Sequence, residues 1–97
     1  MRTIDFNGVT VEYDERCIMS YRWQKAITSG DTDRSIKAFA RLLGGKDEYY
    51  AYAIGTNDPM SYEEWLEAGD DLLDDSMGAM ADLMAAIVED MGQTAKN

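Results

Sequence analysis

The chain has 97 residues, of which 45% are hydrophobic and 29% are charged, and its formal net charge is −10. This length suits one domain, and the hydrophobic fraction is ordinary for a globular protein, which argues against disorder. The negative charge argues against nucleic acid or an anionic membrane as a partner, because both would repel it. With no long apolar stretch and no signal-peptide pattern, we expect a cytoplasmic protein.

The charge is unevenly distributed along the sequence. Residues 1–46 hold eight Lys/Arg against six Asp/Glu, a net of +2, whereas residues 47–97 hold one lysine against thirteen acids, a net of −12. The two halves can therefore attract each other, within a chain or between chains, which would allow self-association into oligomers. The alternative is that the acidic half is a solvated surface that keeps the protein soluble.

The clearest local pattern is near the N-terminus, where Asn7-Gly8 separates two runs of β-forming residues. This dipeptide is the strongest short signal of a hairpin with a two-residue loop. The loop fixes the pairs on the apolar face of the hairpin, which are Phe6–Val9, Ile4–Val11 and Arg2–Tyr13. Because an isolated two-stranded hairpin is unstable in water, this face must pack on helices, while both edges stay open to another strand.

Two segments after the hairpin have apolar residues at helical spacing. Residues 15–28 predict a first helix with an apolar face that includes Met19. Residues 32–43 predict a second, with Asp31 or Asp33 as its N-terminal cap and a glycine just after its end.

The second half of the chain predicts further helices. Residues 46–54 fit either a short helix or a strand, and we favour the helix. Ser61 with Glu64 three residues later forms a capping box, which predicts the start of the next helix. Residues 70–91 predict a long final helix.

These elements predict an α+β fold that is mostly helical. An N-terminal two-stranded hairpin is followed by about four helices, of which the last is long. We expect one domain over residues 1–92 and a frayed polar tail over residues 93–97.

The residue types that carry most enzymatic chemistry are scarce. The chain has no histidine, and its single cysteine, Cys17, is expected to be a buried core thiol. Four carboxylates lie near the start of the last predicted helix: Asp70, Asp71, Asp74 and Asp75. They either hold a divalent cation weakly or form an exposed charged face, and we favour the exposed face because like charges at this spacing repel each other. We therefore predict a protein that is not an enzyme, with no catalytic residue, cofactor or metal ion.

An apolar stripe on the last predicted helix is the feature most able to carry function. Its members alternate in steps of four and three residues: Leu73, Met77, Met80, Met84, Ile87 and Met91. Methionine is flexible and adapts to apolar partners of different shape. The stripe either forms the core with Trp23, Phe39 and Leu43 or faces a helical client. Both can hold if some positions face inward while Leu83 and Val88 widen the exposed side. The acids Asp82, Glu89 and Asp90 lie off the stripe and would border it.

Three segments carry a likeness to a known family: the hairpin IDFNGVTVEYD, the helix end ARLLGG and the helix SMGAMADLMAAIVEDM. In order, size and pattern they resemble the small tail assembly chaperones of siphophages and their prophages. The resemblance implies a non-enzymatic chaperone of the host cytoplasm, absent from the mature virion. Such chaperones coat the tape measure protein and recruit tail tube protein during tail assembly. On this chain the role would fall to the apolar stripe and the open hairpin edge.

An acidic DNA mimic is the second hypothesis. Its carboxylates would imitate phosphates and block a nucleic-acid-binding enzyme. Such a mimic needs a rigid face of evenly spaced carboxylates, whereas the acids of this chain cluster near predicted helix starts.

Overall fold

The computed structural model describes residues 1–56, 60–68 and 75–95. It begins with a hairpin of two antiparallel strands, β1 (Arg2–Phe6) and β2 (Val9–Tyr13). The register is the predicted one, from Arg2 opposite Tyr13 to Phe6 opposite Val9. Asn7 and Gly8 both have positive φ angles, of 52° and 84°, as the tight two-residue turn of a hairpin requires.

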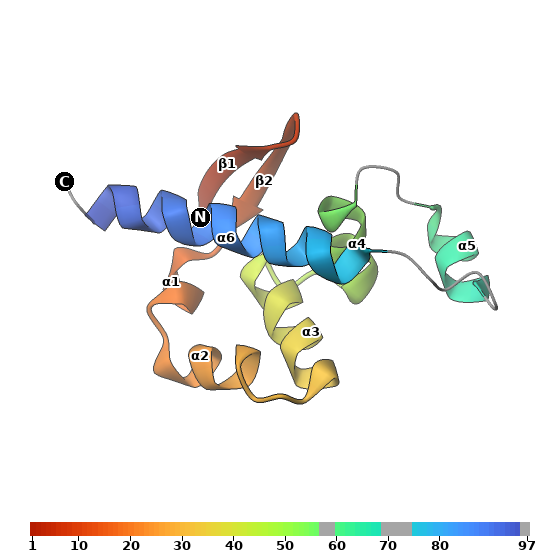
Figure 1. Ribbon diagram of the computed structural model, residues 1–97, viewed down its shortest axis with the longest axis horizontal. Coiled ribbons are helices and arrows are strands. Elements are labelled where there is room, and N and C mark those ends of the chain that lie inside the picture. Colours follow the sequence, from red (N-terminus) through yellow and green to blue (C-terminus); the bar gives the residue numbers. More distant parts are fainter. Residues whose placement is uncertain (57–59, 69–74, 96–97) are drawn as a thin grey trace.

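Six helices follow in the described part of the chain. They are α1 (Glu15–Ile18), α2 (Tyr21–Ile27), α3 (Thr32–Leu42), α4 (Glu48–Gly55), α5 (Tyr62–Glu67) and α6 (Ser76–Ala95). The predicted fold class is therefore confirmed: a mostly helical α+β protein with an N-terminal hairpin and a long last helix. Figure 1 shows α6 running along the molecule, with the hairpin on one side and α1–α3 on the other.

The prediction of one helix over residues 15–28 was wrong, because the chain breaks into α1 and α2. The hydroxyl of Ser20 accepts a hydrogen bond from the backbone N–H of Trp23 at 3.1 Å, which makes Ser20 the N-terminal cap of α2. Serine favours such a cap over a position inside a helix. Met19 ends α1 and is 78% exposed, so it does not join the predicted apolar face.

Side-chain caps set the starts of the next three helices. Asp31 accepts from the N–H of Arg34 at the start of α3, and Asp47 accepts from the N–H of Tyr50 at the start of α4. Residues 46–54 therefore contain the favoured helix rather than a strand. Ser61 caps α5, as the capping box predicts.

The last helix, Ser76–Ala95, extends beyond its predicted C-terminal end at residue 91. The predicted start at residue 70, together with Leu73 and the carboxylates of residues 70, 71 and 74, lies outside the described residues. At the other end α6 continues through Ala95, into the segment that was expected to be frayed.

The core lies where α6 crosses the hairpin and the helices α3 and α4. Its fully buried side chains come from the hairpin, from α3 and its C-terminal cap, from α4 and from α6: Val11, Tyr13, Leu42, Leu43, Ala51, Leu83 and Ile87. Trp23 joins α2 to α3, because its indole N–H donates to the carbonyl of Ala38 at 2.8 Å. Cys17 is buried, as predicted. None of the helices in the described residues is both long and apolar enough to cross a membrane.

Candidate functional site

The predicted stripe on α6 is divided between core and surface. Ile87 is fully buried, and Met80, Met84 and Met91 are partly buried against the core. Met77, in contrast, is 62% exposed. The stripe thus contributes to the core, as one interpretation held, and also reaches the surface at its N-terminal end.

The rotation of α6 decides which apolar residues stay at the surface. Leu83 is fully buried, so the expectation that it widens the exposed side was wrong, whereas Val88 is 49% exposed as expected. Residues three, four or seven apart lie on one side of a helix. Both Met80–Leu83–Ile87 and Met77–Met84–Val88 have such spacing. Packing against α4 and the hairpin buries Leu83 and Ile87 completely and leaves Met80 and Met84 partly buried. Met77 and Val88 stay exposed.

An apolar pocket of about 280 Å³ lies between α6 and α3, and we call it the methionine groove. The residues that line it are Ile27, Ser35, Ile36, Phe39, Met77, Met80, Ala81 and Met84. None of these described residues is charged, and the hydroxyl of Ser35 donates to the carbonyl of Ile27 at 3.2 Å. The groove therefore offers a flexible apolar surface, with three methionines on its α6 wall.

Of the three acids expected to border the stripe, Asp90 contacts the hairpin instead. Asp82 and Glu89 are exposed on α6, as expected. Asp90 instead accepts hydrogen bonds from the hydroxyl of Tyr13 at 2.6 Å and from Nε of Arg2 at 3.1 Å. Burial and the bond to Asp90 raise the pKa of Tyr13 to about 12, and the bonds from Tyr13 and Arg2 lower the pKa of Asp90. Asp90 thus ties α6 to the hairpin.

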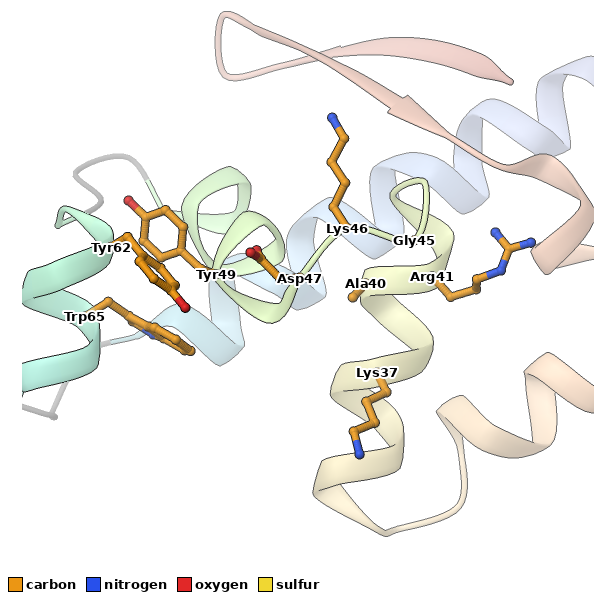
Figure 2. Close-up of a pocket in the computed structure, with 9 residues that line it drawn as sticks. All are labelled: Lys37, Ala40, Arg41, Gly45, Lys46, Asp47, Tyr49, Tyr62 and Trp65. Atoms are coloured by element: carbon orange, nitrogen blue, oxygen red, sulfur yellow. The ribbon is translucent and has the colours of Figure 1, made fainter.

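A second pocket, of about 460 Å³, separates α3 from α5 and is shown in Figure 2. The rings of Tyr49, Tyr62 and Trp65 face it from α4 and α5, and the side chain of Lys37 extends from α3. Tyr49 lies 5.3 Å from Tyr62 and 5.8 Å from Trp65 between ring centroids. The hydroxyl of Tyr49 also donates to the carbonyl of Met60 at 2.6 Å. This aromatic cluster anchors α5 on α4.

A third pocket, of about 660 Å³, opens between α1, α2 and α3, and we call it the basic groove. Its cationic lining residues come from all three helices: Arg16, Arg22, Arg34, Lys37 and Arg41. Its apolar lining residues are Cys17, Trp23, Ala26 and Ala38. Sequence reasoning missed this groove, because its cations are spread between residues 16 and 41 and meet only in the folded state.

One buried carboxylate joins two of these cations. Asp14 is 3% exposed and accepts hydrogen bonds from Nη2 of Arg16 at 2.9 Å and from Nη1 of Arg41 at 3.2 Å. The bonds from Arg16 are the main reason that the pKa of Asp14 lies far below its usual value. The carboxylate is therefore ionised at neutral pH and fixes both guanidinium groups at the edge of the basic groove.

Among the described residues, no cluster of three or more His, Cys, Asp or Glu side chains could bind a metal ion. Burial raises the pKa of the Cys17 thiol, so the less reactive protonated form dominates at neutral pH. What these surfaces can offer chemically is binding, apolar in the methionine groove and mixed apolar and cationic in the basic groove.

Comparisons with known proteins add no relative. A scan against protein-family models found no match, and neither did searches of curated proteins and of solved structures. What the chain binds is therefore inferred from its own surfaces.

Proposed function

We propose that this chain is a non-enzymatic tail assembly chaperone of a long-tailed phage or prophage. In the host cytoplasm it would coat the helical tape measure protein and recruit tail tube subunits. The observation that carries the proposal is the methionine groove, an apolar pocket of the described residues with Met77, Met80 and Met84 along one wall.

The groove suits a helical client for two physical reasons. An amphipathic helix binds by laying its apolar face into such a groove, and methionine side chains adjust to clients of varying sequence. Each contact is small, so a coat would hold through many weak contacts and remain displaceable by tail tube protein.

The proposal is tested by co-expression with the tape measure protein encoded in the same genome. We expect the chain to co-purify with it and to keep it soluble. Met77→Glu should weaken binding by about tenfold or more, because it places a carboxylate at the mouth of an apolar groove. Met19→Glu is the matched control, since Met19 is also exposed but does not line the groove.

Two results would count against this function. Equal binding by the Met77→Glu and Met19→Glu variants would remove the groove from the client interface. Recovery of a nuclease or polymerase in place of the tape measure protein would favour the DNA-mimic hypothesis.

A further inference from the structure

We propose that the basic groove binds helix α5 of a second copy of this chain, so that copies join head to tail. The inference rests on the proposed function, because a coat along an elongated client needs contacts between neighbouring copies. It names the two surfaces that would form this contact.

The charge of the chain is concentrated more sharply than its two halves indicate. Residues 14–46 hold seven Lys/Arg and four Asp/Glu, a net of +3, and the other residues hold two Lys/Arg and fifteen Asp/Glu, a net of −13. The basic groove lies within the positive segment, and Arg22 and Arg34 are exposed at its edge. Arg34 also lies 4.0 Å from the exposed carboxylate of Asp31 in its own chain. A second copy is thus a strongly acidic partner for this groove.

The chemistry of the groove calls for more than negative charge. Cys17, Trp23, Ala26 and Ala38 provide apolar surface between the cationic side chains. A purely polar acidic segment would leave this surface uncovered, whereas an apolar side chain flanked by carboxylates would cover it.

Helix α5 presents such a combination. Glu63, Leu66 and Glu67 are spaced i, i+3 and i+4, which places them on one face of the helix. Leu66 is 58% exposed, both glutamates are exposed, and neither forms an ion pair with the described residues. Tyr62 and Trp65 contact Tyr49 of α4, whereas Leu66 is exposed and remains available to a partner.

The two surfaces lie on different parts of the molecule. Figure 1 shows α5 at one end of the long axis and α1 and α2 toward the other half, below α6. None of the described α5 residues lines the basic groove of the same chain. A contact between two different surfaces does not close on itself in a dimer, so it produces a ring or an open chain of copies.

The test is sedimentation equilibrium of the full chain and two charge-reversal variants. One carries Arg22→Glu and Arg34→Glu, and the other carries Glu63→Lys and Glu67→Lys. We expect the native chain to associate at about 0.05 M salt and to dissociate toward about 0.5 M salt, where charges are screened. Each variant alone should associate about tenfold or more weakly, and an equimolar mixture should recover association because reversed surfaces match again.

The matched control for the α5 variant is Glu12→Lys with Glu89→Lys. It makes the same change in net charge as Glu63→Lys with Glu67→Lys, but at exposed residues away from α5. It should associate at least as well as the native chain, and circular dichroism should show that all variants are folded. A native chain that stays monomeric at low salt would overturn the inference. So would a mixture that fails to recover association, even where the Met77→Glu test upholds client binding.

Discussion

At the scale of single residues, Asp14 joins three elements of the structure. It caps α1 by accepting from the N–H of Arg16, and its own N–H donates to the carbonyl of Leu42 at 2.8 Å. Its carboxylate also receives the guanidinium groups of Arg16 and Arg41. One side chain thus connects the end of the hairpin, the start of α1 and the end of α3.

Replacing Asp14 with asparagine should change the pH dependence of stability. The pKa of Asp14 is lowered in the folded state, so its ionised form stabilises the fold above its unfolded pKa of about 4. That contribution is lost as the pH falls through the folded pKa. We expect Asp14→Asn to lower the free energy of unfolding at pH 7 by about 1–3 kcal/mol and to lose less stability on acidification, measured by urea unfolding at neutral and acidic pH.

Asp33→Asn provides the control for this prediction, since Asp33 is exposed and pairs only at the surface with Lys37. A surface pair of this kind contributes about 0–1 kcal/mol. If Asp14→Asn and Asp33→Asn showed the same free energy of unfolding at neutral pH, the claim that the Asp14 carboxylate stabilises the fold would be refuted.

At the scale of elements, the hairpin and α6 are linked by a polar contact inside a mostly apolar interface. The Tyr13 hydroxyl lies between Arg2 and Asp90, with bonds of 3.1 Å and 2.6 Å. Because Tyr13 is fully buried and Asp90 is charged, this link should matter more than a typical surface hydrogen bond.

Tyr13→Phe should therefore loosen the attachment of α6 to the hairpin. We expect a loss of about 1–2 kcal/mol in the free energy of unfolding, together with faster amide hydrogen exchange near Asp90. Tyr21→Phe should have almost no effect, since Tyr21 is 77% exposed. Equal stability of the two variants would show that the Tyr13–Asp90 bond does not hold α6.

The elements that sequence reasoning predicted best are those whose signals are local. Asn7-Gly8 fixes the hairpin register through its own backbone geometry, and Ser61 with Glu64 marks a helix start. The break between α1 and α2 was missed because apolar spacing continues across Ser20, whose hydroxyl caps the start of α2. The rotation of α6 could not be predicted from spacing, because two apolar lines compete and tertiary packing chooses between them.

At the scale of the whole molecule, the protein combines an acidic exterior with two grooves of different character. The methionine groove between α3 and α6 is uncharged, and the basic groove between α1, α2 and α3 carries five cations. The first was anticipated in part, since Met77, Met80 and Met84 belong to the predicted stripe. The second depends on three helices meeting in space, which no local pattern reveals.

The central claim is that the methionine groove is where the client binds. The chain has seven methionines, so labelling their methyl groups with ¹³C gives NMR probes both inside and outside the groove. On titration with a helical fragment of the tape measure protein, we expect the signals of Met77, Met80 and Met84 to shift to saturation while those of Met1 and Met19 stay in place. Saturating binding that leaves the Met77 signal unmoved would contradict the claim.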